Sequence, residues 1–120
     1  MMSIEEIFRK IERVPDYAGR KIHSVHDKNG YGDTPLHIVS YWGDVEAIQI
    51  LFDAGANLNE KGESGYTPLH CAAEQNRPDA IVKLIELGSV NLVDDNGDTP
   101  LSLAQSLGNT EVINVLQAHI

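Results

Sequence analysis

The sequence predicts an all-α fold in which helical hairpins of one design stack side by side. The tetrapeptide Thr34-Pro35-Leu36-His37 returns 33 residues later as Thr67-Pro68-Leu69-His70, and 32 residues after that as Thr99-Pro100-Leu101-Ser102. Nine residues after each threonine comes a residue that tolerates a left-handed backbone, which is Gly43, Asn76 or Gly108. A fixed period of this length is typical of helix–turn–helix repeats that bury their core between neighbouring units.

The first 28 residues lack the repeated motif and predict a helix that covers one end of the stack. Ser3 and Glu6 fit a capping box, and Pro15 ends or kinks the helix. The apolar residues between them have the i, i+3, i+4, i+7 spacing of one helical face: Ile4, Ile7, Phe8 and Ile11. Whether residues 16–22 form a second short helix is left open, as is the conformation of residues 14–28.

Each repeated unit predicts a first helix, a tight break and a second helix. Thr34, Thr67 and Thr99 are N-cap residues, and the proline after each fits the first helical position. Asp44 and Asn109 are predicted to cap second helices. The second helices have apolar residues on one face: Ile48, Leu51, Phe52, Ile81, Leu84, Ile85, Val112, Ile113 and Leu116.

The three units read G-D-T-P-L-H from Gly32, G-Y-T-P-L-H from Gly65 and G-D-T-P-L-S from Gly97. This pattern resembles the ankyrin repeat family across residues 29–120. The resemblance implies an ankyrin repeat solenoid with an N-terminal cap (1–28) and three repeats (29–61, 62–93 and 94–120) in one cooperative domain. It also implies that His37 and His70 hydrogen-bond turn backbone and tie adjacent units together. Polar Ser102, Gln105 and Gln117 depart from the family pattern as a terminal unit would, so we expect the array to end there.

The charge is negative overall and concentrated in the repeats. The chain has 9 Lys and Arg against 18 Asp and Glu, a net charge of −9, and residues 29–120 hold only three of the basic residues against thirteen acidic ones. Nucleic-acid binding relies on clustered Lys and Arg, so it is not expected. The balance favours a basic protein partner, the alternative being that the acids only keep the surface soluble.

No apolar run approaches the length of a membrane span, and the N-terminus lacks the layout of a secretory signal. The single cysteine, Cys71, cannot form a disulfide within the chain. We therefore expect a soluble cytoplasmic protein, monomeric when free, with no membrane partner.

The resemblance implies that partners meet the loop tips and the exposed face of the first helices. Carried over residue by residue, the binding set is Tyr31, Asp33, Tyr41, Trp42, Glu63, Ser64, Tyr66, Glu74, Gln75, Asp95, Asn96, Asp98, Ser106 and Leu107. Large aromatics among carboxylates favour an interface that selects a basic counterpart. The alternative is that Tyr41 and Trp42 only pack on the neighbouring unit.

Catalytic and metal-binding functions have weak signals in this sequence. His23, His26 and Asp27 could share a metal, but no fourth ligand is apparent. Asp94 and Asp95 fit a solvated tip, and Cys71 fits a partly shielded structural thiol. No glycine-rich phosphate motif is present, so no catalytic residue, metal or cofactor is expected.

The sequence thus predicts a non-catalytic protein–protein interaction module that binds a folded, basic protein. Its small size and negative charge motivate the further hypothesis that it acts as an inhibitor. An immunity or antitoxin-type protein that neutralises a basic toxin is a concrete alternative. An enzyme or metal protein ranks below both, as does an adaptor that also uses the second-helix face, because those exposed residues fit an ordinary solvated surface.

Overall fold

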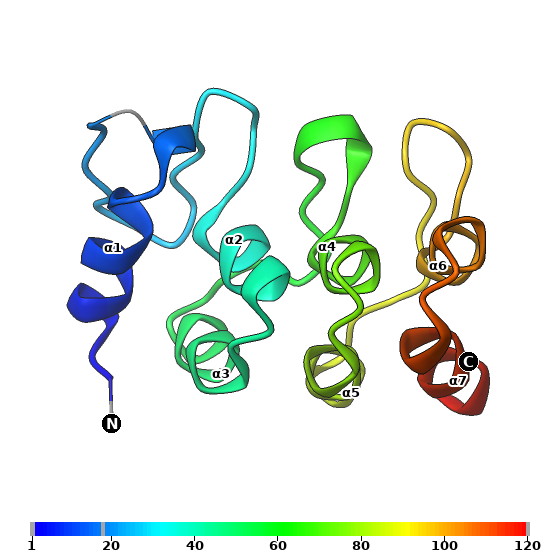
Figure 1. The fold of residues 1–120 in the computed structure, drawn as a ribbon. Helices are drawn as coiled ribbons and strands as arrows, with labels where there is room; N and C mark the ends of the chain where they lie inside the picture. Colours follow the sequence, from blue (N-terminus) through cyan, green and yellow to red (C-terminus); the bar gives the residue numbers. More distant parts are fainter. Residues whose placement is uncertain (1, 18, 120) are drawn as a thin grey trace.

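A computed structural model describes residues 2–17 and 19–119. The described residues form α-helices and two short 3₁₀ helices, with no strand among them (Figure 1). The α-helices are α1 (Ile4–Glu12), α2 (Pro35–Trp42), α3 (Val45–Asp53), α4 (Pro68–Glu74), α5 (Pro78–Leu87), α6 (Pro100–Leu107) and α7 (Thr110–His119). The predicted all-α class is confirmed.

The hairpins stack in two rows. The first helices α2, α4 and α6 contact one another in sequence, and the second helices α3, α5 and α7 do the same. In Figure 1 the loop tips of the repeats all project from one side of these rows, and the N- and C-terminal parts of the chain lie at opposite ends. The predicted ankyrin-type solenoid is therefore confirmed.

The N-terminal segment lies at one end of this stack. Helix α1 begins after Ser3, whose hydroxyl accepts the N–H of Glu6 as predicted, and it contacts both α2 and α3. After Pro15 the chain forms a 3₁₀ turn, Pro15–Tyr17, and Ala18 lies outside the described residues. Because α1 covers the end of the first hairpin, we propose that residues 1–28 act as the cap of a three-repeat array.

Most predicted helix starts are confirmed, and the start at Thr34 differs in its hydrogen bonds. The hydroxyls of Thr67 and Thr99 accept backbone N–H groups three residues on, and the Asp44 carboxylate accepts the N–H of Ala47. At Thr34 the hydroxyl instead lies 2.8 Å from Nδ1 of His37. The N–H of His37 donates to the Thr34 carbonyl, so the backbone itself satisfies this helix start.

The breaks between helices confirm one prediction and correct another. Gly43, Asn76 and Gly108 have left-handed φ values of 72°, 54° and 72°. Asn109, however, does not cap its own helix: its side-chain amide donates to the carbonyls of Ala73 and Glu74 at the end of α4. The N–H of Val112 in α7 is accepted by Asn76, so the preceding repeat supplies this cap.

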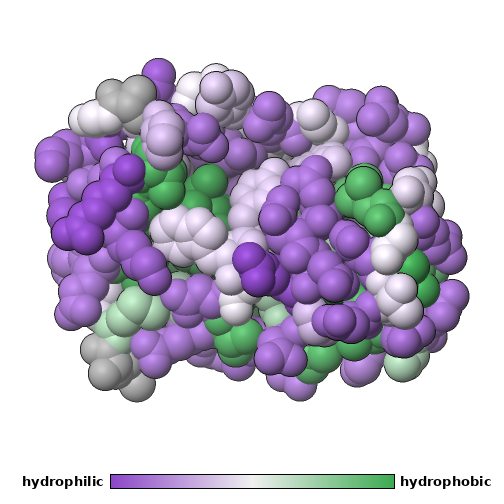
Figure 2. Space-filling model, viewed as in Figure 1, coloured by the Kyte–Doolittle hydropathy of each residue, from purple (hydrophilic) through white to green (hydrophobic). Residues whose placement is uncertain are grey.

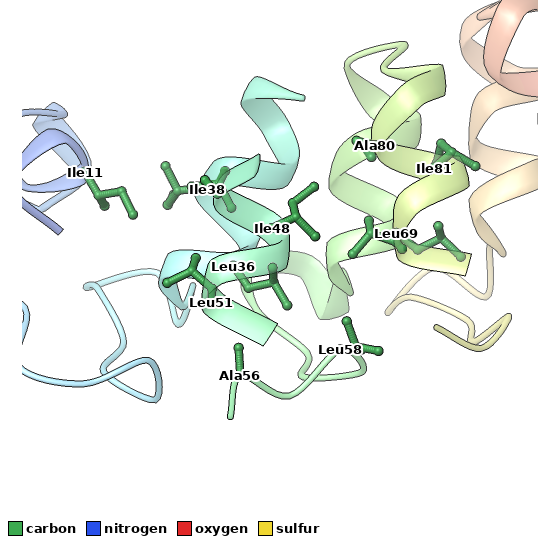
Figure 3. Close-up of a cluster of buried hydrophobic side chains, with 14 of the residues drawn as sticks. Ile11, Leu36, Ile38, Ile48, Leu51, Ala56, Leu58, Leu69, Ala80 and Ile81 are labelled. Carbon is green, nitrogen blue, oxygen red and sulfur yellow. The ribbon is translucent and has the colours of Figure 1, made fainter. Parts of the chain in front are cut away.

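The core runs continuously through the stack, between successive hairpins. Figure 3 shows aliphatic side chains from both helix rows pointing into the spaces between units. The most buried include Leu36, Ile48, Leu51, Leu69, Ile81 and Leu84. Burying a side chain of this size contributes roughly 1.5–3 kcal/mol, so the stability of each hairpin depends on the adjacent hairpin.

Candidate functional site

The three loop tips share one backbone geometry. In each, the N–H of the first residue donates to the carbonyl four residues on: Asn29 to Asp33 at 2.9 Å, Gly62 to Tyr66 at 2.8 Å, and Asp94 to Asp98 at 2.8 Å. Asn29 and Asp94 also accept N–H groups within their own loops through a side-chain oxygen. The tips are therefore closed turns with fixed shape.

Adjacent tips are also bonded to one another. A carboxylate oxygen of Asp33 in the first tip accepts the N–H of Glu63 in the second at 3.0 Å. The Ser64 carbonyl of the second tip accepts the N–H of Asp95 in the third, also at 3.0 Å. Because Asp33 is only 2% exposed, its prediction as a surface carboxylate is wrong: it joins the tips instead.

His37 and His70 link successive repeats, as the resemblance implied. Nε2 of His37 lies 2.8 Å from the Glu60 carbonyl and 2.9 Å from the Tyr66 carbonyl, and Nε2 of His70 lies 2.8 Å from the Asp98 carbonyl. Nδ1 of each ring accepts the backbone N–H of the threonine three residues earlier, which places the proton of the neutral ring on Nε2. Burial lowers the pKa of both imidazoles.

Five of the predicted binding residues line one hollow on the face formed by the loop tips and the first helices. The hollow has a volume of about 260 Å³ and is lined by Tyr41 of α2, Glu74 of α4 and the tip residues Glu63, Ser64 and Tyr66. We call it the acidic hollow. The Tyr66 ring is stacked on His70, with centroids 5.4 Å apart and planes 16° apart, so one wall of the hollow is fixed by a buried residue.

The chemistry of the acidic hollow is set by neutral tyrosines beside charged carboxylates. Burial raises the pKa of Tyr41 and Tyr66 well above the ordinary phenol value, and the charge of Glu74 adds to both shifts. The phenols therefore stay protonated at neutral pH. The negative charge of the hollow comes from Glu63 and Glu74, which can accept hydrogen bonds from a cationic side chain.

A second hollow of about 310 Å³ shares Tyr41 with the first and is also lined by residues that follow α1. Its lining consists of Val14, Asp16, Ile38, Tyr41, Trp42, Gln75 and Arg77, and we call it the mixed hollow. The Lys10 ammonium lies 5.2 Å from the centroid of the Trp42 ring, and Nε of Arg77 donates to the Tyr41 carbonyl at 3.0 Å. The Trp42 ring is thus partly covered by the Lys10 ammonium of the same chain.

Sequence reasoning missed four residues of the mixed hollow: Val14, Asp16, Ile38 and Arg77. The first two belong to the segment outside the repeated motif, so no family position identified them. Arg77 carried the one available signal, since it is one of only three basic residues after Lys28. Its position beside a first-helix carbonyl depends on the packing of two successive repeats.

The remaining predicted residues lie on the tips and on α6 but do not line either hollow. Tyr31 is 55% exposed and Leu107 is 50% exposed, whereas the Asp98 carboxylate accepts a hydrogen bond from Ser102. The exposed members of this group are Tyr31, Asp95, Asn96, Ser106 and Leu107. They extend the candidate surface along the stack without forming a concave site.

Cys71 and Asp94 are placed differently from their predictions. Cys71 is fully buried, so the expectation of partial exposure is wrong, and burial raises the pKa of its thiol. Asp94 is 5% exposed and holds the N–H groups of Asn96 and Asp98, so it is not a solvated tip residue. Both side chains point inward because the tip and the first helix close over them.

The candidate metal residues do not converge. The Asp27 carboxylate accepts the backbone N–H groups of His23 and Ser24, which orders a turn, and the imidazoles of His23 and His26 belong to exposed residues. Within residues 2–17 and 19–119, no three His, Cys, Asp or Glu side chains come together as metal ligands would. None of the helices described there is long and apolar enough to cross a membrane.

Comparison with known proteins agrees with this geometry. A family model described as "Ankyrin repeats (3 copies)" matches residues 14–94, more than half of the chain. The chain belongs to the ankyrin repeat family. Ankyrin repeats generally mediate protein–protein interaction. The match begins at residue 14, within the segment that lacks the tetrapeptide.

Several ankyrin repeat proteins are similar to the chain. Putative ankyrin repeat protein FPV031 of Fowlpox virus is 37% identical over 74% of the chain and 28% of its own length. Human protein phosphatase 1 regulatory subunit 27 is 36% identical over 60% of the chain and 47% of its length. Mouse Rabankyrin-5 is 33% identical over 71% of the chain and 7% of its length. The chain spans less than half of each of these relatives.

Proposed function

We propose that the chain is a non-catalytic protein-binding module whose tips and first helices bind a basic surface of a folded partner. The observation that carries the proposal is the acidic hollow, where Tyr41, Glu63, Ser64, Tyr66 and Glu74 line one concavity. Aromatic anchors in a concave site are typical of binding hot spots, and carboxylates beside them select against acidic partners.

The charge of the whole chain supports the same proposal. Residues 29–120 carry a net charge of −10, so a basic partner is attracted before contact and an acidic one is repelled. The hydrogen bonds between neighbouring tips also favour binding, because a surface that is already ordered loses little conformational entropy in the complex.

As a finer version, we propose that binding inhibits the partner by covering its basic site, as an immunity or antitoxin-type protein would cover a basic toxin. Net charge and a single concave face motivate this version. We further propose that the chain acts as a monomer in the cytoplasm. Its only cysteine is the buried Cys71, which is a free thiol.

The proposal is tested by two variants of equal charge change on opposite faces. Glu63→Gln with Glu74→Gln neutralises the acidic hollow, whereas Glu86→Gln with Glu111→Gln neutralises exposed positions on the second helices α5 and α7. Wild-type protein and both variants are immobilised in parallel. Basic proteins retained from the native extract are purified and titrated against each form by calorimetry, at low and high salt.

We expect wild type and the second-helix variant to bind a basic protein equally, and the hollow variant to bind it at least tenfold more weakly. Affinity should fall as salt rises, because screening weakens the attraction between exposed charges. Equal binding by the two variants would place the interface elsewhere. If no basic protein titrates with the wild-type chain, the proposed function is rejected, and if the bound partner keeps its activity, the inhibitor version is rejected.

A further inference from the structure

We propose that the acidic hollow and the mixed hollow form one groove for a short partner segment, with an arginine in the first and a large apolar side chain in the second. The inference rests on the proposed function and names the partner chemistry at that face. Its basis is that Tyr41 lines both hollows, so the two concavities are neighbours on the surface.

The acidic hollow fits a guanidinium better than an ammonium. Two glutamates, Glu63 and Glu74, line this concavity together with two tyrosines, and none of the described residues that line it is basic. A guanidinium group is planar and can pair with carboxylates through two parallel hydrogen bonds, whereas a lysine ammonium is a compact point charge without this fork geometry. The phenols stay protonated and add to the polar lining without changing the charge.

A buried carboxylate strengthens the negative potential of this hollow from behind. Asp94 is 5% exposed, and one of its carboxylate oxygens has no hydrogen-bond partner among the described residues. Its charge contributes to the raised pKa of Tyr66, which lines the hollow. A cation placed against Tyr66 would therefore offset a carboxylate that the chain itself leaves half satisfied.

The mixed hollow favours an apolar occupant because its lining charges balance and much of its lining is apolar. Its two charged lining residues, Asp16 and Arg77, have opposite signs, and Arg77 is held by the Tyr41 carbonyl. Lys10 already lies over the Trp42 ring, so the described lining has no excess negative charge to attract a second basic side chain. Ile38, Val14 and Trp42 provide the apolar lining. Figure 2 shows apolar and near-neutral surface gathered between α1 and α2 on this face, with hydrophilic surface around it.

The two hollows together therefore select a pattern and not only a charge. Each site favours its own ligand: the polar, doubly acidic lining of the acidic hollow disfavours an apolar group, and the described lining of the mixed hollow, where Arg77 offsets Asp16, lacks the net negative charge that would hold an arginine. A segment that placed its apolar side chain in the acidic hollow and its arginine in the mixed hollow would be mismatched at both sites. The partner is thus a basic protein that presents an arginine close in sequence to a leucine-sized residue on an exposed or extended segment.

The experiment uses small probes and the whole chain labelled with ¹⁵N. Acetyl-arginine amide and acetyl-citrulline amide have nearly the same shape, but only the first is charged. Four acetylated peptide amides then combine leucine and arginine in both orders, adjacent or separated by one glycine. Backbone amide shifts give the location and the affinity of each probe, and fluorescence of Trp42, the chain's only tryptophan, reports the mixed hollow.

We expect acetyl-arginine amide to shift the amides of Glu63, Ser64, Tyr66 and Glu74, and acetyl-citrulline amide to leave them unchanged. At least one of the four peptides should bind about tenfold more tightly than acetyl-arginine amide, since burial of one leucine-sized side chain is worth at least that factor. Glu63→Gln with Glu74→Gln should abolish the arginine response. Trp42→Ala should remove only the gain from leucine.

Equal shifts with citrulline and arginine would overturn the inference, as would shifts confined to other surfaces or no gain from leucine in any order. Thermal unfolding of each variant is measured alongside, and Trp42→Phe replaces Trp42→Ala if the latter does not fold. If a basic protein binds the first-helix face while all small probes fail, the groove is rejected and the proposed function stands. Failure of both binding experiments rejects both.

Discussion

Removal of the His37 ring should destabilise the fold more than any exposed histidine substitution. The ring accepts the buried Thr34 N–H and donates to the Glu60 and Tyr66 carbonyls of the next repeat. His37→Ala leaves these backbone groups without that hydrogen-bond partner. Each buried polar group left unpaired lowers the free energy of unfolding by about 1–3 kcal/mol. With partial access of water to Glu60, we expect a loss of about 3–5 kcal/mol in the free energy of unfolding, or roughly 12–20 °C in Tm.

The assay is urea unfolding followed in parallel by far-UV circular dichroism and Trp42 fluorescence, whose coincidence tests two-state behaviour. His37→Gln keeps a side-chain amide that can donate to the same carbonyls, so its free energy of unfolding should fall clearly less than that of His37→Ala. His26→Ala is the matched control on an exposed residue and should change stability by less than about 0.5 kcal/mol. A loss below about 1 kcal/mol for His37→Ala, or equal losses for Ala and Gln, would refute the role of this hydrogen-bonded link between repeats.

Three further predictions follow from the same contacts. Burial lowers the pKa of His37 and His70 below the ordinary 6.5, so the unfolded chain takes up protons first as the pH falls. The free energy of unfolding should therefore decrease as pH drops below about 6.5, and equilibrium unfolding measured across pH should show this slope. The double variant His37→Gln with His70→Gln should flatten it. Gly62→Ala places a methyl group against the Asp33 carboxylate and the His37 ring, and should cost about 1–3 kcal/mol by urea unfolding, whereas Gly30→Ala, whose methyl group would meet only the end of the Arg20 side chain at 3.9 Å, should be nearly neutral. Asn109→Ala removes two hydrogen bonds to the end of α4 and should speed amide hydrogen exchange in α7 more than in α2; equal acceleration in both helices would contradict this link.

The periodic features of the chain were predictable because they follow from local chemistry. Threonine caps, N1 prolines and left-handed break residues fix where each helix starts and ends, whatever lies beside it. Gly43, Asn76 and Gly108 therefore appear at the expected positions with the expected backbone. Asn109 was predicted wrongly because an asparagine before a helix usually caps it, and only the preceding repeat offers the α4 carbonyls that it binds.

The candidate site was predictable in composition and not in detail. Tyr41, Tyr66 and Glu74 could be assigned to one face from the repeat register, and they do meet in one hollow. Asp33 could not be distinguished from an exposed tip carboxylate, since its acceptor role requires the Glu63 N–H of the next tip. The mixed hollow was missed because its wall comes partly from a segment without repeat register.

The sequence by itself determined the repeated hairpins, their boundaries and the negative charge of the repeats, since period, capping and composition are properties of neighbouring residues along the chain. Only the tertiary structure decided which polar side chains form hydrogen bonds between repeats and which remain exposed to a partner. That division depends on contacts about 30 residues apart in sequence, such as Asp33 with Glu63 and His37 with Tyr66. Identical residue types at a tip can be buried or exposed, and the packing of the adjacent repeat selects between the two.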